Sequence, residues 1–168
     1  MLIELRLEPP ASGGGGIIND YNSDEDDVRL MLFDICNSLG AGSRFIISGF
    51  GQDQWPVDTT TDLVTYLEQL PMAIISLRNG DDFEIDFYEQ GIERRISFSK
   101  IAEKYVLECF SSTEWQPDPR LEEISLPKIF NMPEDNLEDF LNYIKNYFRE
   151  LSDHPWIREW ITGKWNLN

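Results

Sequence analysis

The stretch Phe83-Glu-Ile-Asp-Phe-Tyr-Glu-Gln-Gly-Ile-Glu-Arg-Arg-Ile-Ser-Phe98 decides the fold. Apolar and polar residues alternate in it on both sides of Gln90-Gly91, and alternation around a turn signal predicts an antiparallel hairpin. A two-residue loop at Gln90-Gly91 sets the register: Phe83 opposite Phe98, Ile85 opposite Ile96 and Asp86 opposite Arg95. This register joins apolar side chains on one face and opposite charges on the other, so cross-strand chemistry favours it. The pairing of Phe87 with Arg94 does not fit this pattern.

The rest of the chain divides by the spacing of its apolar residues. Spacings of three and four predict helices over residues 23–39 and 59–70, the first with Ser23 and Asp26 as a capping box and the second ended by Pro71. A spacing of two predicts strands over residues 2–7, 72–77, 83–88, 92–98 and 105–110, with Asn79-Gly80 as a further hairpin turn. A short, mostly apolar run predicts a buried strand over residues 44–50. Residues 111–132 are predicted to be largely irregular, with at most a short strand over 123–126. A helical pair follows over residues 133–163, and its first helix begins at Pro133.

This order of elements predicts a single α+β domain over residues 1–168, a mainly antiparallel sheet (a meander) with helices packed on one face. A length of 168 residues suits one domain, and 41% hydrophobic residues are too many for a disordered chain. The proline- and glycine-rich segment over residues 9–22 is too short for a domain linker. It is predicted to be a flexible loop.

The charge is strongly one-sided, with 31 Asp and Glu against 14 Lys and Arg, a formal net charge of −17. Nucleic-acid binding and docking on anionic membranes both normally need a basic surface, so neither is expected. Residues 1–8 alternate apolar and charged side chains, which predicts a first strand and not a signal peptide. No apolar stretch reaches the ~18–20 residues that span a bilayer. A cytoplasmic location is therefore expected.

No motif in the sequence predicts catalysis, a cofactor or a metal site. Asp20, Asn22 and Asp24 match the start of a calcium loop, but Glu25 stands where the loop needs glycine and Met31 where it needs glutamate. The lone histidine, His154, lies at a helix start and is interpreted as a cap or surface residue. Cys36 and Cys109 are isolated thiols in apolar surroundings and are predicted to be buried and reduced. We therefore expect that the protein is not an enzyme.

The candidate binding residues combine acidic side chains with tryptophans in predicted loops. Tryptophan is enriched among the residues that dominate protein interfaces, and an acidic rim attracts a basic protein. The candidates for contact with a partner are Asp24, Asp26, Asp27, Asp53, Trp55, Asp58 and Trp115. Together they predict a basic protein as the partner.

In these features the chain resembles the bacterial immunity proteins of contact-dependent growth inhibition and other polymorphic toxin systems. The resemblance rests on the strand at residues 1–8, the acidic helix at 23–39, the hairpin at 83–98 and the tryptophan-containing tail. It implies a cognate toxin domain, often a basic nuclease, that is held inactive while acidic side chains stand in for substrate phosphates. Two alternatives remain open: another protein-binding regulatory or adaptor module, and an enzyme with a carboxylate-rich divalent-metal site.

Overall fold

The computed structural model describes residues 1–10, 19–22 and 24–164. The described residues contain helices and two antiparallel sheets, which confirms the predicted α+β class. The strands are β1 (Leu2–Arg6), β2 (Arg44–Ser48), β3 (Phe83–Phe87), β4 (Arg94–Ile101), β5 (Lys104–Ser111) and β6 (Leu121–Ser125). The helices are α1 (Val28–Asn37), α2 (Thr61–Asn79), α3 (Leu126–Tyr147), α4 (Arg149–Ser152) and α5 (Pro155–Ile161). Most of the predicted flexible loop over residues 9–22, namely residues 11–18, lies outside the described residues.

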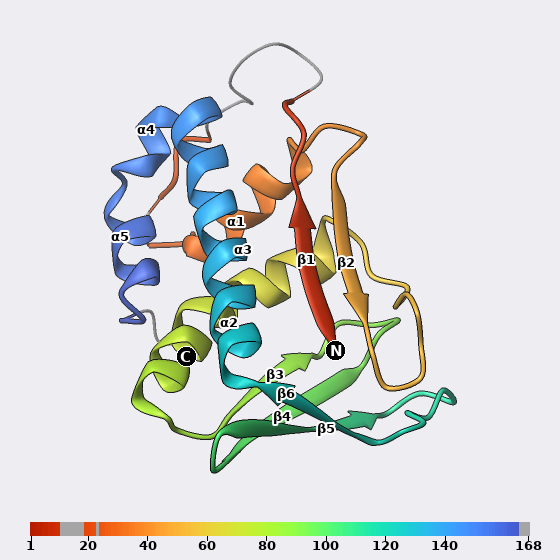
Figure 1. The fold of residues 1–168 in the computed structure, drawn as a ribbon. Coiled ribbons are helices and arrows are strands. Elements are labelled where there is room, and N and C mark those ends of the chain that lie inside the picture. Colours follow the sequence, from red (N-terminus) through yellow and green to blue (C-terminus); the bar gives the residue numbers. More distant parts are fainter. Residues whose placement is uncertain (11–18, 23, 165–168) are drawn as a thin grey trace.

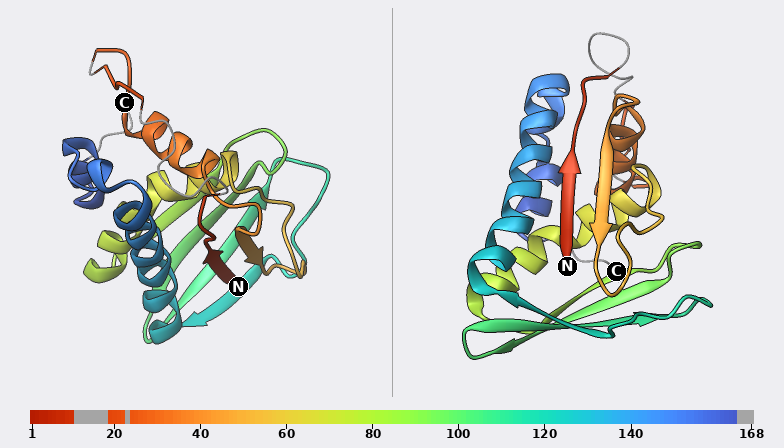
Figure 2. Two further views of the ribbon diagram at one scale, coloured as in Figure 1. Left: turned by 90° about the horizontal axis from the view of Figure 1, so that it is seen from above. Right: turned by 45° about the vertical axis from the view of Figure 1, so that its right-hand side comes forward.

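The elements are arranged in layers (Figure 1). The four-stranded sheet, in the order β3-β4-β5-β6, forms the lower layer, and the helices with the β1–β2 pair lie above one of its faces. No described element covers the opposite face, as the right panel of Figure 2 shows. The view from above in Figure 2 places β1, β2 and α3 on one side of the upper layer and α1 on the other. The covered face of the sheet therefore builds the core, and the other face stays open.

The hairpin has the predicted register, with Phe83 opposite Phe98 and Asp86 opposite Arg95. The rings of Phe83 and Phe98 stack with their centroids 4.4 Å apart, so the apolar pairing expected on the inner face is present. The loop is longer than predicted, because β3 ends before residue 88 and β4 begins after residue 93. Its backbone includes left-handed conformations at Gly91 and Glu93, with φ of 112° and 44°. A two-residue turn is thus replaced by a six-residue loop over 88–93, and the register is unchanged.

The predicted strand over residues 72–77 is wrong, because α2 continues through Pro71 to Asn79. A proline inside a helix has no N–H for the carbonyl four residues earlier, and this missing bond usually ends the helix. Here that carbonyl belongs to Leu67, and the indole Nε1–H of Trp160 donates a hydrogen bond to it at 2.9 Å. A tryptophan from α5 therefore satisfies the group that the proline leaves free, and the helix continues.

The predicted hairpin turn at Asn79-Gly80 is instead the end of α2. Gly80 has a left-handed backbone, with φ 75° and ψ 25°, which glycine adopts without steric cost. Its N–H donates to the Leu77 carbonyl at 3.0 Å, and the N–H of Asp81 donates to the Ser76 carbonyl at 2.9 Å. These two bonds satisfy carbonyls at the helix end, so the same dipeptide that predicts a hairpin here stops a helix.

The segment before the last helices is more regular than predicted. Its strand β6 pairs antiparallel with β5 and covers most of the short strand allowed over residues 123–126. The following helix, α3, begins at Leu126 with Pro127 in its first turn, so Pro133 lies inside the helix and does not start it. Pro127 fits there because the first N–H groups of a helix have no intrahelical partner.

The first helix begins later than predicted, and its acidic residues precede it. Asp27 is the N-cap residue, and its carboxylate accepts a hydrogen bond from the Leu30 N–H at 3.1 Å. Ser23, the predicted cap, lies outside the described residues. The turn before the helix is held by Asn22, whose carbonyl accepts from the N–H groups of Glu25 and Asp26 at 3.1 and 2.8 Å. The acidic residues therefore do not occupy the first helical turn.

Candidate functional site

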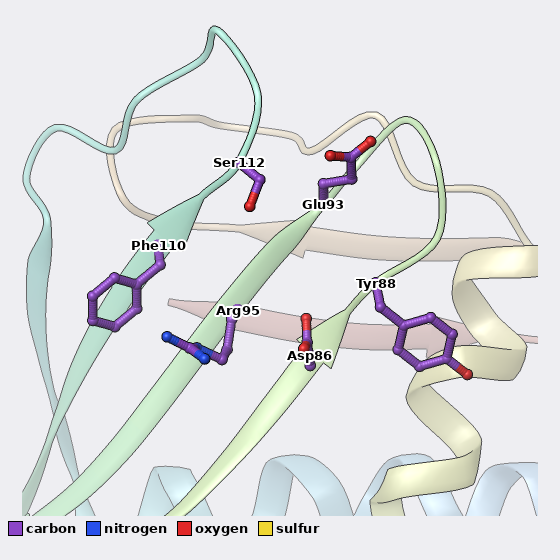
Figure 3. Close-up of a pocket in the computed structure, with 6 residues that line it drawn as sticks. All are labelled: Asp86, Tyr88, Glu93, Arg95, Phe110 and Ser112. Carbon is purple, nitrogen blue, oxygen red and sulfur yellow. The ribbon is translucent and has the colours of Figure 1, made fainter.

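A hollow of about 330 Å³ lies on the open face of the four-stranded sheet (Figure 3). Its lining side chains are Asp86, Tyr88, Glu93, Arg95, Phe110 and Ser112. The strand register places Asp86 opposite Arg95 and Arg95 opposite Phe110, so β3, β4 and β5 each contribute one side chain to a row across the sheet. The loop over residues 88–93 and the residue after β5 contribute the others. The hairpin register thus builds the floor of the hollow.

Charge and aromatic surface alternate in this hollow. The Arg95 guanidinium lies 5.0 Å from the centroid of the Phe110 ring, and the Arg120 guanidinium lies 4.6 Å from it. Arg95 also pairs with Glu84, with Nε and Oε1 3.7 Å apart. Burial raises the pKa of Asp86, although Arg95 opposes this effect. The hollow therefore offers carboxylates, a guanidinium and aromatic rings, which suits polar binding of a charged group.

A second group of acidic side chains adjoins the hollow at Tyr88. We call it the acidic cluster, and it consists of Asp27, Asp58, Asp62, Glu68 and Glu89. Arg29 from α1 is bonded within it: its guanidinium donates to Glu68 at 3.3 Å and also to Glu89 and to the Tyr88 hydroxyl. The Tyr88 hydroxyl donates to the same Glu68 oxygen at 2.7 Å. The cluster therefore joins α1, α2 and the loop over residues 88–93.

The carboxylates of the acidic cluster repel one another. Burial raises the pKa of Glu68, and the nearby charges of Asp27 and Glu89 raise it further against the opposing effect of Tyr88 and Arg29. Burial likewise raises the pKa of Asp62, with Asp58 and Glu89 as additional causes. The Oε1 atom of Glu68 is buried and has no hydrogen-bond partner in the described structure. Groups with perturbed pKa values and unfavourable contacts are concentrated at functional sites, so the cluster is a candidate site.

These pKa shifts predict that the protein is more stable at about pH 5 than at about pH 7.5. The pKa values of Asp62, Glu68 and Asp86 are raised in the folded protein by burial, so the folded chain binds protons more readily than the unfolded chain and gains stability as the pH falls from neutral towards the ordinary carboxyl range. At Asp58 burial alone would raise the pKa, but hydrogen bonds from the Thr60, Thr61 and Asp62 amides outweigh it and lower the pKa. Its contribution is therefore lost only below about pH 4, the ordinary aspartate range.

Thermal unfolding followed by circular dichroism at several pH values between about 7.5 and 4 checks this expectation. The variant Asp62→Asn/Glu68→Gln should show a flatter dependence of Tm on pH, because two of the responsible carboxyl groups are gone. A Tm that falls steadily between pH 7.5 and 5 would contradict the prediction.

A buried arginine lies on the inner face of the same end of the sheet. Arg94 is 4% exposed, and its guanidinium carbon lies 3.5 Å from the ring centroid of Trp115 and 4.5 Å from that of Trp55. Its Nη1 donates to Oε1 of Gln52 at 2.8 Å, whereas its Nε has no partner in the described structure. Burial lowers the pKa of Arg94. Arg94, the residue opposite Phe87 that does not fit the cross-strand pattern, is thus accommodated by two indole rings and one side-chain amide.

The structure places the two predicted tryptophans at different depths. Trp55 is 1% exposed, so in this conformation it offers almost no surface to a partner. Trp115 is half-buried, and the centroids of the two tryptophan rings lie 6.0 Å apart. Trp55 therefore supports Trp115 and Arg94 from below, and Trp115 is the one of the pair that reaches the surface. Asp53, in the loop between β2 and α2, is exposed.

The other predicted acidic residues lie at helix starts. Asp27 and Asp58 are exposed members of the acidic cluster, and each also accepts hydrogen bonds from amides at a helix N-terminus. Asp24 is exposed and Asp26 is half-buried in the turn before α1, where the Asp26 carboxylate accepts from the Asn22 N–H at 2.8 Å. The structure thus brings Asp27 and Asp58 into one cluster, with Asp24 and Asp26 in the turn that leads into α1. Trp115 lies instead against Arg94, and Asp53 is exposed in the loop between β2 and α2.

Several residues of the site are absent from the sequence-based candidates: Arg29, Asp62, Glu68, Asp86, Tyr88, Glu89, Glu93 and Arg95. The hairpin register could have identified Asp86 and Arg95 as neighbours on one face. The cluster around Glu68 gives no such signal, because it joins residues that are far apart in the chain and become neighbours only when α1, α2 and the loop pack together.

The remaining reactive side chains are held in structural positions. Cys36 and Cys109 are both buried and free, as predicted, and burial raises the pKa of Cys109 to about 11. His154 is the N-cap of α5, and its ring nitrogen accepts from the Trp156 N–H at 3.2 Å, in agreement with the predicted cap.

Within residues 1–10, 19–22 and 24–164, no group of three or more His, Cys, Asp or Glu side chains is arranged to hold a metal ion. None of the helices in these ranges is both long and apolar enough to cross a bilayer.

No family model, curated protein or solved structure matches this chain. Its function is therefore inferred from the charges and contacts of the hollow and of the acidic cluster.

Proposed function

We propose that this protein binds and neutralises a basic protein domain, in the manner of an immunity or inhibitor protein in the bacterial cytoplasm. The observation that carries the proposal is the acidic cluster, in which carboxylates from α1, α2 and the loop over residues 88–93 converge around Arg29. Such a concentration of negative charge opposes folding at neutral pH. A basic partner would relieve the repulsion, so the negative charge of the cluster favours binding of such a partner.

The surroundings of the cluster support a protein as the partner. Tyr88 is 45% exposed and connects the acidic cluster to the hollow, where Asp86 and Glu93 add two more carboxylates. A lysine or arginine side chain that reaches the hollow can pair with these carboxylates. The Phe110 ring is already in contact with the guanidinium groups of Arg95 and Arg120. Aromatic anchors next to charged rims are typical of protein interfaces. The surface therefore suits a folded domain that presents basic side chains.

The toxin domains that the sequence resemblance implies have this chemistry. A nuclease binds phosphates with cationic side chains, and carboxylates on an inhibitor can pair with the same side chains. The exposed carboxylates of Asp27 and Asp58 and the half-buried carboxylate of Glu89 would then occupy the positions of substrate phosphates. We therefore propose a basic toxin domain as the partner and its inactivation by the complex as the function.

Co-expression tests the proposal. If a gene next to the one for this protein encodes a toxin domain, cells that express the domain alone should stop growing, and cells that also express this protein should grow. The variant Asp27→Asn/Asp58→Asn/Glu89→Gln should protect poorly. The variant Asp81→Asn/Glu103→Gln/Glu150→Gln has the same change in net charge at exposed positions outside the cluster and should protect fully. Equal loss of protection in both variants would contradict a role for the acidic cluster.

A further inference from the structure

A stripe of short polar side chains lines the side of α3 that faces β1. Its members are Asn131, Asp135, Asp139, Asn142 and Asn146. Spacings of four, four, three and four residues place them along one face of the helix over several turns. All five residues are exposed. None of their side chains forms a hydrogen bond or an ion pair with another described residue. These donors and acceptors are therefore free to bind something else.

The stripe forms one wall of a continuous groove. Two hollows of about 400 and 390 Å³ lie along α3, and they adjoin because both are lined by Leu5 and Asp139. Leu2, Leu5 and Leu7 from β1 and the segment after it line the opposite wall. An extended chain fits a groove of this form better than the surface of a folded domain does.

The composition of the stripe is poor for a helix that serves only the fold. Asparagine and aspartate are among the weaker helix formers, because their side chains compete for backbone hydrogen bonds. Exposed helix positions that pack against nothing are usually filled by stronger helix formers. The buried face of α3 already contributes Ile129, Phe140 and Ile144 to the core, so folding does not require amides and carboxylates on the exposed face.

The groove has both apolar and acidic surface. Leu2 is 36% exposed and Met132 is half-buried, and both line the groove at its β1 end. Glu4, Asp135 and Asp139 bring carboxylates to the same part of the groove, where Lys128 is the basic lining residue. Glu4 is paired at 2.6 Å with Arg6, which lines the adjoining hollow, so Asp135 and Asp139 are the carboxylates available to an occupant. Alternating apolar and carboxylate surface is complementary to a strand-like segment that alternates apolar and basic side chains.

Backbone groups of β1 that face the groove are already hydrogen-bonded to the side chain of Asn136. The side-chain amide of Asn136 accepts from the Leu5 N–H at 3.1 Å and donates to the Ile3 carbonyl at 3.2 Å. This amide closes the edge of the strand in the way that a neighbouring strand would. An occupant must therefore be bound by side chains of the groove. The asparagine amides of the stripe can form hydrogen bonds with the N–H and C=O groups of its main chain.

We infer that the groove between β1 and α3 binds an extended segment of another protein in which Lys or Arg residues alternate with apolar residues. The carboxylates of Asp135 and Asp139 hold its basic side chains, and Leu2 and Met132 contact its apolar ones. This inference goes beyond the proposed function and does not depend on it, since Figures 1 and 2 place β1 and α3 on the side of the upper layer away from α1.

The test uses a synthetic heptapeptide in which Lys and Leu alternate, blocked at both ends, titrated into the ¹⁵N-labelled protein. Shifts of backbone amide signals should be confined to residues 2–7 and to the stripe. The variant Asp135→Asn/Asp139→Asn keeps the size of both side chains and should bind about five- to tenfold more weakly, as expected for the loss of two exposed charge pairs. The variant Asp27→Asn/Asp58→Asn/Glu89→Gln should bind the peptide as the wild type does.

The controls separate this inference from the proposed function. A peptide with Glu in place of Lys should not shift the groove signals. Equal binding of both peptides, or undiminished binding by Asp135→Asn/Asp139→Asn, would overturn the groove proposal and leave the acidic cluster untouched. Replacing Asn131, Asn142 and Asn146 by Ala should also weaken binding, and it cannot do so by unfolding α3, because alanine is the better helix former.

Discussion

Asp27→Asn/Asp58→Asn/Glu89→Gln should associate with the proposed basic partner about ten- to a hundredfold more slowly than the wild type at low salt. Charges at the edge of an interface act mainly during the encounter, when complementary potentials steer the two molecules together. Removing three carboxylates from the acidic cluster weakens this steering, whereas dissociation should change less. Stopped-flow fluorescence at several ionic strengths measures both rates.

Amides are the right substitutes because Asp27 is the N-cap of α1 and Asp58 accepts hydrogen bonds from the amides at the start of α2. The Asp27 carboxylate accepts from the Leu30 N–H at 3.1 Å, and the Asp58 carboxylate accepts from the N–H groups of Thr60 and Thr61 at 2.8 and 2.6 Å. Asparagine caps a helix about as well as aspartate, so these variants lose charge and keep the cap. Lysine at the same positions would remove the caps as well, and a folding defect could then be mistaken for slower association.

The control with the same total charge is Asp81→Asn/Glu103→Gln/Glu150→Gln. Asp81 and Glu103 lie near the end of the four-stranded sheet away from the loop over residues 88–93, and Glu150 lies in α4. This variant should associate nearly as fast as the wild type and keep most of the salt dependence. If both variants slow association equally, net charge alone steers the encounter. If neither rate responds to salt or to substitution, the electrostatic basis of the proposed function is wrong.

Trp55→Ala should lower the free energy of unfolding by about 3–5 kcal/mol, as expected for removing a large aromatic side chain from a core. Trp55 is 1% exposed, and its ring centroid lies 6.3 Å from that of Phe50 and 6.1 Å from that of Phe87. Its removal also takes away one of the two rings against which the Arg94 guanidinium is buried. The loss therefore combines a cavity with a poorly compensated charge.

Urea unfolding followed by circular dichroism measures this effect. Arg94→Met is the informative partner variant, because methionine fills much of the same space without a buried charge that lacks a carboxylate. In the double variant the cost of Trp55→Ala should be smaller than in the wild type, since no charge remains to be exposed. Unchanged stability of Trp55→Ala together with faster dissociation from the partner would instead support the sequence-based hypothesis that Trp55 is an interface residue.

The hairpin could be predicted from the sequence, whereas the second half of α2 and the start of α3 could not. The hairpin register follows from neighbouring residues, since Phe83, Asp86 and their partners lie within one short stretch of chain. The second half of α2 could not be predicted, because the carbonyl freed by Pro71 is satisfied by Trp160, and the two bonded residues are 93 positions apart. The prediction that α3 begins at Pro133 was wrong for a related reason. A proline is compatible with a helix interior only where the surrounding structure accommodates it.

The candidate site likewise has features that the sequence predicts and features that depend on tertiary packing. The excess of acidic side chains, the predicted positions Asp24, Asp26, Asp27, Asp53 and Asp58, and the row of Asp86 and Arg95 can all be obtained from the sequence. The depth of a side chain cannot, because burial depends on what packs over it, and Trp55 and Trp115 differ in depth although both stand among acidic loop residues. Charge composition and the hairpin pairing are thus properties of the sequence itself. The acidic cluster, the burial of Arg94 and the course of α2 were decided by tertiary structure, since each depends on contacts between residues far apart in the chain.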